Sequence, residues 1–208
     1  MPLEYEYKIS NYDKKLILDK IIQLNGKKMG HFIFKVMVFS HPRKKKKTYI
    51  RIRDEGHRIT MTYKNYAGSK FASESEVIIN DFEMGKNILL GLGCISRYYY
   101  EKIREIWHIG NTEICFDTLP GKPEFMEIES ATKKELDEMV KTLNLVDKID
   151  TNNNVLYDKF GLVLDKGVSV IFDNIDILAK YVTKNIDQFK ILIEQQKKLY
   201  DSVKNGKQ

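Results

Sequence analysis

The sequence contains little that would support a disulfide-stabilised or membrane-spanning protein. It has only two cysteines, Cys94 and Cys115, too few for a disulfide framework, and neither stands in a metal-binding cluster. No apolar run approaches the roughly 18 residues that a membrane helix needs. The first residues also lack the apolar core of a signal peptide. We therefore expect a cytoplasmic protein.

Motifs of several common catalytic sites are absent as well. The sequence has no glycine-rich loop ending in GK[ST] and no GxSxG motif, so P-loop and hydrolase-elbow chemistry are unsupported. Its four histidines occur without HxxxH or HExxH spacing, which leaves a histidine-bound metal unsupported. The net charge of +6 suits a phosphorylated partner, but in a chain of this length it is equally compatible with solubility alone.

Apolar alternation with a period of two, which is typical of β-strands, runs through much of the chain. Eight segments bounded by turn residues show it. They are Leu3–Ile9, His31–Phe39, Lys47–Asp54, Arg58–Lys64, Ser73–Ile79, Tyr98–Ile106, Asn111–Asp117 and Glu124–Ser130. The pattern predicts an α+β protein dominated by antiparallel strands.

Helical periodicity interrupts the strand series. The predicted helices are Tyr12–Leu24, capped by Asn11 and ended by Gly26, a short helix capped by Asn80 with Glu83 and ending near Gly91 and Gly93, and Lys133–Leu143. A polar loop at 151–154 and the segment 156–161 follow. A helical tail is then predicted from about Val168 to Val203, and its apolar residues recur at helix spacing, so we expect it to pack on the strands.

Seven of the eight predicted strands carry a charged stripe opposite their apolar residues. In the first strand Glu4, Glu6 and Lys8 share one face, because side chains alternate along a strand. The other stripes are Arg51 with Arg53, Lys64, Glu74 with Glu76, Lys102 with Arg104, Glu113 with Asp117, and Glu127 with Glu129.

Two explanations of these stripes fit the residues alone. An antiparallel sheet with one face in water shows the same alternation. The stripes, however, are nearly pure carboxylate or pure cation, and like charges two positions apart on a strand lie roughly 7 Å apart and repel. A metal ion between the carboxylates and phosphate oxygens between the cations would relieve this repulsion. Strands closed into a barrel with the stripes inward would then form a polyphosphate and metal site.

These motifs resemble, in order and spacing, those of the CYTH superfamily, the triphosphate tunnel metalloenzymes. That group contains class IV adenylyl cyclases, thiamine triphosphatases and inorganic triphosphatases. The motifs are Glu4-x-Glu6-x-Lys8, 49–56, 59–64, Lys102-Ile-Arg104, Asp117 and 125–129. The resemblance implies an eight-stranded antiparallel β-barrel tunnel with packed helices. Residues 1–161 would form this tunnel domain, and residues 162–208 would be a helical C-terminal extension packed on it.

Two segments bear on the resemblance in opposite ways. Phe34–Pro42 lacks the Asp-x-Tyr-Tyr type motif that family members often have after the second strand. Leu119–Pro123 is similar to a Pro-Gly-x-Pro loop of a bacterial branch commonly labelled adenylyl cyclase. Nothing in the tail after Gly161 matches a family motif. Trp107 and the cluster Tyr98–Tyr100 are predicted to pack in the barrel instead of stacking on a base.

The resemblance also implies a metal-dependent triphosphatase. Mg²⁺ or Mn²⁺ would be held by Glu4, Glu6, Glu127 and Glu129, because hard cations prefer oxygen ligands. The triphosphate would be bound by Lys8, Arg51, Arg53, Lys64, Lys102 and Arg104. The catalytic set would be Glu4, Glu6, Lys8 and Lys64. Glu74, Glu76 and Asp117 would bind a second ion or orient the cations.

The substrate stays open at this point. Inorganic triphosphate, a nucleoside triphosphate and thiamine triphosphate all satisfy the motifs, and the rival reactions are cyclisation of ATP to cyclic AMP and binding of polyphosphate without catalysis. A nucleic acid would enter only as an RNA 5′ end, for which the basic run Arg43–Lys47 could act as an electrostatic collar instead of a simple hairpin turn. No membrane partner is expected, and the protein would be a monomer or homodimer.

Overall fold

The computed structural model describes residues 3–43, 46–67, 71–150, 159–162 and 169–206. Within them, eight strands form one antiparallel sheet in the order β1-β8-β7-β6-β2-β3-β4-β5. The strands are β1 (Tyr5–Ile9), β2 (Lys27–Ser40), β3 (Thr48–Asp54), β4 (Ile59–Asn65), β5 (Ser73–Ile79), β6 (Ile95–Ile109), β7 (Thr112–Thr118) and β8 (Phe125–Ser130). The predicted α+β class and all eight strands are confirmed.

β2 and β6 are longer than predicted. They pair from Lys27 opposite His108 to Ser40 opposite Ile95, with irregular register near Gly30 and Phe39. The additional residues of β2 include Lys27 and Lys28, whose exposed side chains break the apolar alternation. Strand pairing therefore extends beyond the segments that alternation alone can identify.

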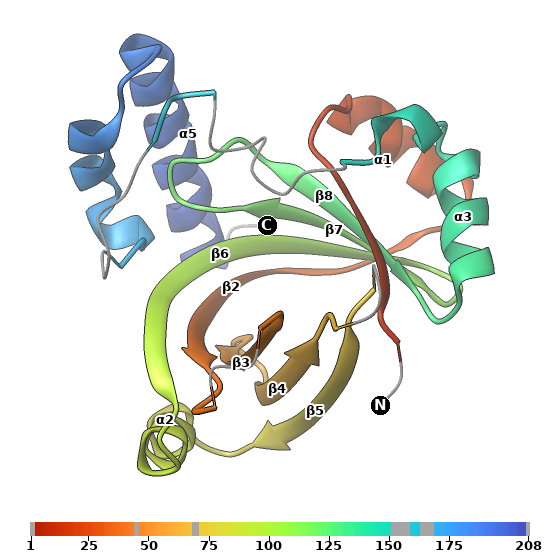
Figure 1. Ribbon diagram of the computed structural model, residues 1–208. Coiled ribbons are helices and arrows are strands. Elements are labelled where there is room, and N and C mark those ends of the chain that lie inside the picture. Colours follow the sequence, from red (N-terminus) through yellow and green to blue (C-terminus); the bar gives the residue numbers. More distant parts are fainter. Residues whose placement is uncertain (1–2, 44–45, 68–70, 151–158, 163–168, 207–208) are drawn as a thin grey trace.

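The sheet curls strongly, so that its two edge strands approach each other (Figure 1). An isolated antiparallel bridge joins Leu3, just before β1, to Ser73 of β5. Beside it, the Glu4 N–H donates to the Ala72 carbonyl at 2.9 Å. The half-barrel is thus joined across its edges at this point, in agreement with the expected tunnel architecture.

Three α-helices lie between the strands or directly after the last one in the described chain: α1 (Lys14–Gln23), α2 (Phe82–Gly91) and α3 (Lys133–Thr142). The predicted caps Asn11 and Asn80 are wrong. Asp13 caps α1 by accepting from the Leu16 N–H at 3.1 Å, and Asp81 caps α2 by accepting from the Met84 N–H at 2.7 Å. Each segment offers two capping side chains in close succession, and the packing of the helix decides which one is used.

The helices cover the convex outer face of the sheet. Residues of α1 and α3 pack over β1, β7 and β8, where Ile21 and Leu136 meet Met126 and Ile128, all without solvent exposure. α2 covers β3, where Leu89 packs against Phe39 and Ile52. Because the apolar residues of the strands face these helices, their charged stripes must face the concave side.

In the described residues, the predicted helical tail consists of two helical elements. A 3₁₀ segment, η2 (Phe172–Tyr181), is followed by α5 (Ile186–Lys204), after a short 3₁₀ turn η1 (Val146–Lys148) earlier in the chain. The buried residues of η2 are Phe172, Ile175 and Leu178. Their spacing of three matches a 3₁₀-helix, and Asn185 between the two elements has a left-handed φ of 53°.

The tail packs on the outer face of β6. Ile103 of β6 is fully buried in a cluster with Phe172, Leu178 and Phe189. The predicted loop at 151–154, residues 156–158 and position 168 lie outside the described residues. In the part of the chain that the structure describes, no helix is long and apolar enough to cross a membrane.

Candidate active site

A cavity of about 790 Å³ occupies the concave side of the sheet. Residues of seven strands and of the neighbouring turns line it. The lining includes all the predicted metal ligands and phosphate-binding residues: Glu4, Glu6, Lys8, Arg51, Arg53, Lys64, Lys102, Arg104, Glu127 and Glu129, together with Glu74 and Glu76. The structure therefore brings the charged stripes of the sequence into one cavity, and a solvated outer face no longer explains them.

Three carboxylates gather where β1 meets β8. One oxygen from each of Glu4, Glu6 and Glu129 can be chosen so that all three lie within 4.8 Å of one another. This follows from the strand register, which sets Glu6 directly opposite Glu129. Burial and the neighbouring charges of Glu4 and Glu6 raise the pKa of Glu129 to about 8. Burial also raises the pKa of Glu4 and of Glu6.

This carboxylate cluster fits a divalent cation. Its donor atoms are all carboxylate oxygens, which Mg²⁺ and Mn²⁺ prefer. They come together where β1 pairs with β8. Burial is the first cause of all three raised pKa values, and the charges of Glu4 and Glu6 add to it at Glu129. An ion bound by the three carboxylates would remove the repulsion between their charges.

Glu127, predicted as a fourth metal ligand, has different neighbours. Its carboxylate accepts from Lys8 Nζ on one side and from Arg104 Nη2 on the other. Burial alone would raise its pKa, but Lys8 and Arg104 outweigh burial and hold the pKa well below the usual range. The structure thus places Glu127 among the cations, beside the cluster of the other three carboxylates.

Asp117 bonds to two of the cations that line the cavity. It is fully buried and accepts from Lys102 Nζ at 2.8 Å and from Arg104 Nε at 2.7 Å. Arg104 also contacts Glu127, so this guanidinium is held from two directions. Burial and the neighbouring Arg104 lower the pKa of Lys102. Asp117 is thus paired with two of the predicted phosphate-binding cations, and of its two predicted roles this contact favours the orientation of cations.

Glu74 and Glu76 contact a second group of cations, which lie on β3 and β4. Glu74 lies 2.9 Å from Lys64 Nζ and 3.7 Å from Arg51 Nη2. Glu76 lies 3.5 Å from Arg53 Nη2 and accepts from the Thr62 hydroxyl at 2.7 Å. Both carboxylates contact cations, and in the described chain neither belongs to the three-carboxylate cluster.

β2 is the strand without a charged stripe, and none of its residues lines the cavity. Its buried Phe34 nevertheless lies close to three of the cations that do. The Phe34 ring centroid is 5.4 Å from the Arg53 guanidinium, 5.6 Å from Lys102 Nζ and 5.7 Å from the Arg104 guanidinium. Such cation–π contacts stabilise a desolvated cation without neutralising it. The segment that departs from the usual family motif thus contacts three of the predicted phosphate-binding residues.

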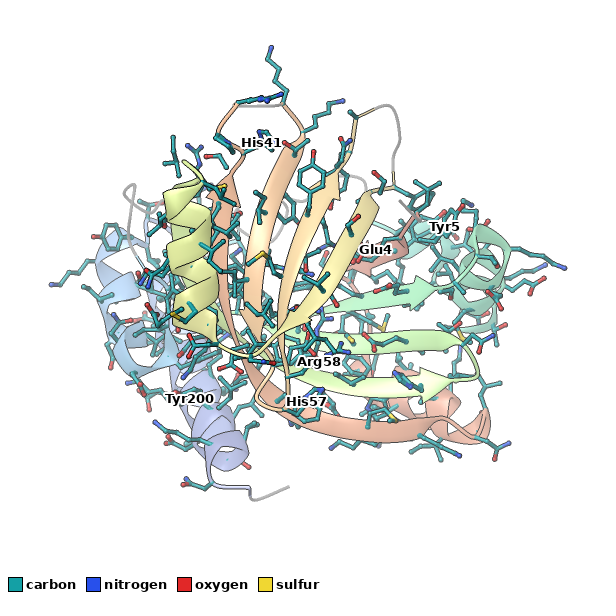
Figure 2. All side chains as sticks on the ribbon, turned by 90° about the horizontal axis from the view of Figure 1, so that it is seen from below. Glu4, Tyr5, His41, His57, Arg58 and Tyr200 are labelled. Atoms are coloured by element: carbon teal, nitrogen blue, oxygen red, sulfur yellow. The ribbon has the colours of Figure 1, made fainter. Side chains whose placement is uncertain are left out.

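Several lining residues were not predicted from the sequence. Arg58 precedes β4, enters the cavity and bonds through Nε to Glu55 at 2.7 Å (labelled in Figure 2). Arg58 is the first residue of the predicted strand Arg58–Lys64 and lies on the same face as Lys64, so alternation could have identified it. Glu113 was part of a charged stripe but had no assigned role, and it lines the cavity while bonding His108 at 3.1 Å.

The aromatic predictions are confirmed in part. Trp107 packs against the cluster under α1 and α3. Tyr100 packs beside Phe34 and Val36 but also lines the cavity, so it is not restricted to packing. In the basic run Arg43–Lys47, positions 44 and 45 lie outside the described residues. The remaining residues of the run are exposed between β2 and β3, and none of them lines the cavity.

A curled antiparallel sheet with carboxylates and cations on its concave side has the architecture of a tunnel protein. A family model described as the CYTH domain matches residues 2–149. The chain therefore belongs to the CYTH family, and the resemblance found in the sequence is confirmed.

Solved structures share the fold. The PH1012 protein of Pyrococcus horikoshii has a TM-score of 0.61 and 21% identity over 72% of this chain and 95% of its own. An adenylate cyclase candidate from Vibrio parahaemolyticus has a TM-score of 0.63 and 16% identity over 73% and 95%. A Hippeastrum adenylyl cyclase candidate with a dominant triphosphatase activity has a TM-score of 0.52 and 12% identity over 74% and 91%. Among curated proteins, none matches the chain.

Proposed function

We propose that this protein is a metal-dependent phosphohydrolase that cleaves a triphosphate inside the cavity. The observation that carries the proposal is that a carboxylate cluster and a set of cations line the same cavity. Three carboxylates with raised pKa values lie at the β1–β8 junction, and six predicted phosphate-binding cations line the same space. A ligand that combines a divalent cation with a chain of phosphates neutralises both groups at once.

Glu4, Glu6 and Glu129 would hold the ion, which we expect to be Mg²⁺ or Mn²⁺. When bound, such an ion supplies positive charge to phosphate oxygens and lowers the pKa of a coordinated water. Glu127, the other predicted ligand, contributes mainly by fixing Lys8 and Arg104. Its role in this proposal is therefore to position cations next to the ion site.

The cations would bind the triphosphate from two sides. Arg51, Arg53 and Lys64 project from β3 and β4, while Lys102 and Arg104 project from β6. Arginine can bind two phosphate oxygens at once. Catalysis of phosphoryl transfer depends mainly on such positioning and charge neutralisation.

Lys8 and Lys64 are suited to the phosphoryl group that reacts. Lys64 contacts Glu4, and Lys8 lies 3.3 Å from Glu6, so both ammonium groups border the carboxylate cluster. Charged carboxylates outweigh the effect of burial and raise the pKa of both lysines, which keeps them protonated at neutral pH. A phosphate placed between them would lie next to the proposed ion.

A product assay tests the proposal. The protein is incubated with tripolyphosphate, ATP or thiamine triphosphate, with Mg²⁺, Mn²⁺ or EDTA, and phosphate, pyrophosphate and cyclic AMP are separated and quantified. We expect orthophosphate that disappears with EDTA and in Glu129→Gln, but persists in Glu138→Gln, whose side chain is exposed on α3. Pyrophosphate with cyclic AMP would instead identify a cyclase. Tight tripolyphosphate binding without any product would identify a binding protein.

The same assay separates the substrates. An RNA with a 5′-triphosphate end is included, since it would be the one nucleic-acid substrate compatible with the tunnel. The ratio of kcat/KM between the substrates then shows which group, if any, the protein recognises beyond the phosphates.

A further inference from the structure

Gln196 of α5 binds the turn that joins β7 to β8. Its side chain is buried, with 3% exposure. The amide oxygen accepts from the Gly121 N–H at 2.8 Å, and the amide nitrogen donates to the carbonyls of Leu119 at 3.1 Å and Lys122 at 2.7 Å. One side chain therefore satisfies three backbone groups of a short turn, which will be called the 119–122 turn.

The turn and the tail are also complementary in shape. Gly121 has a φ of +74°, which favours glycine. A Cβ at this position would lie 2.7 Å from Leu178 Cδ1 and 3.3 Å from the Phe189 ring. The backbone of the turn thus lies directly against η2 and α5, and there is no room for it to shift outward.

The tail holds β6 in a comparable way. The Phe172 N–H donates to the buried carboxylate of Glu101 at 3.0 Å, and the Glu101 N–H donates to the Val170 carbonyl at 3.0 Å. Ile103, two positions along the strand, is buried under the tail. Lys102 and Arg104 alternate with these residues and face the cavity.

The tail therefore fixes, from outside, the strands that carry much of the phosphate-binding site. The 119–122 turn connects Asp117 of β7 to Glu127 of β8, and Arg104 bonds to both carboxylates. A displacement of the turn would change the separation of these two carboxylates and thus the position of the guanidinium. The turn also brings Lys122 close enough to Lys8 for their charges to interact.

We propose that Gln196 is a positioning residue of the active site, and that the C-terminal extension acts through it to hold the phosphate-binding cations in place. This inference rests on the proposed function, because it concerns the same cavity. The family match ends at residue 149, so the positioning contact comes from a part of the chain beyond the matched domain.

Two neighbouring glutamines provide the test. Gln196→Leu removes all three hydrogen bonds while nearly conserving volume. Gln195→Leu changes the adjacent residue, which is exposed on the same helix. Binding of tripolyphosphate is measured by calorimetry with Mg²⁺ at a temperature where circular dichroism shows every variant folded. We expect affinity to fall roughly five- to tenfold in Gln196→Leu, since lost positioning hydrogen bonds carry about that effect, and to stay unchanged in Gln195→Leu.

A second variant controls for a possible misfolding of Gln196→Leu. Gln196→Glu retains an acceptor for the Gly121 N–H and loses the two donors, so its affinity should lie between those of the wild type and Gln196→Leu. Where turnover occurs, KM should rise while kcat stays within about twofold. Wild-type affinity in folded Gln196→Leu and Gln196→Glu would overturn the inference. Absence of tripolyphosphate binding in the wild type would instead overturn the proposed function on which the inference rests.

Discussion

Glu127 and Glu129 lie two positions apart on the same face of β8, yet their pKa values move in opposite directions. Both are buried, which favours the neutral acid in each case. Glu127 is bonded by Lys8 and Arg104, whereas Glu129 faces Glu4 and Glu6. At the residue scale, the neighbours of each carboxylate therefore decide whether it pairs with cations or is suited to bind a metal ion.

The carboxylate cluster predicts a specific response to metal. At a Mg²⁺ concentration 100 times its Kd, binding stabilises the folded protein by about 2.7 kcal/mol, or roughly 5–10 °C in Tm for a domain of this size. Glu129→Gln should lose most of this shift, because a neutral amide replaces one of the three anionic ligands. Thermal unfolding with and without Mg²⁺ measures it. An undiminished shift in Glu129→Gln would contradict the proposed ion site.

Phe34 is predicted to act through the cations above it. Phe34→Leu removes an aromatic ring from Arg53, Lys102 and Arg104, and each lost cation–π contact is worth about 0.5–1 kcal/mol. The three contacts together are worth about 1.5–3 kcal/mol, so we expect the Kd for tripolyphosphate to rise about ten- to a hundredfold. Phe39→Leu is the matched control, because Phe39 is equally buried but packs under α2. Equal effects of the two substitutions on Kd would refute this role for Phe34.

Among the elements, the 119–122 turn carries a buried cation that should make stability depend on pH. Burial and the charge of Lys8 lower the pKa of Lys122 from 10.5 to about 7. Between these values the unfolded chain holds more protons than the folded one, so this group makes stability rise with pH across that window. Below pH 7 both states are protonated and the contribution is constant.

Lys122→Met tests this pH dependence. The variant should be more stable than the wild type near pH 7, and the difference should shrink as pH rises towards 10. Urea unfolding at several pH values measures the difference. A constant difference over the whole range would show that Lys122 keeps its ordinary pKa in the folded protein.

The strands could be predicted from the sequence because most of them alternate apolar and charged residues. Ile50 and Ile52 alternate with Arg51 and Arg53, and this contrast identifies both the strand and its cavity face. The caps and the tail were less predictable. Asp13 and Asn11 are chemically similar candidates for one cap, and the 3₁₀ segment η2 has apolar spacing that also fits an α-helix.

Within the site, contacts that cross several strands could not be predicted from the sequence. The charged stripes identify the cavity face of β1 and of β8, and the resemblance to the CYTH superfamily grouped Glu6 with Glu129. Their register, which sets the two directly opposite each other, comes from the structure. The bond from Arg104 to Glu127 crosses β7, and no local pattern reports it. Gln196 lies in a polar stretch of α5 beside exposed Gln195, and only tertiary packing reveals its burial.

For the whole molecule, Ile103 connects the sheet to the tail. It is fully buried between β6 and the cluster of η2 and α5. Ile103→Ala should destabilise the protein by about 2–5 kcal/mol, because it leaves a cavity where two parts of the fold meet. Ile177→Ala, at an exposed position of η2, should cost far less. Urea unfolding measures both, and similar losses would contradict the role assigned to Ile103.

The pairing of β1 with β8 also has a kinetic consequence. It brings Tyr5 opposite Ser130, and contacts between residues so distant along the chain tend to form late in folding. Glu4 and Glu6 come from one of these strands and Glu129 from the other, so the ion site is assembled only when the two ends of the domain have met. Mg²⁺ should therefore slow unfolding and leave the refolding rate nearly unchanged, which stopped-flow measurements with and without the ion can determine.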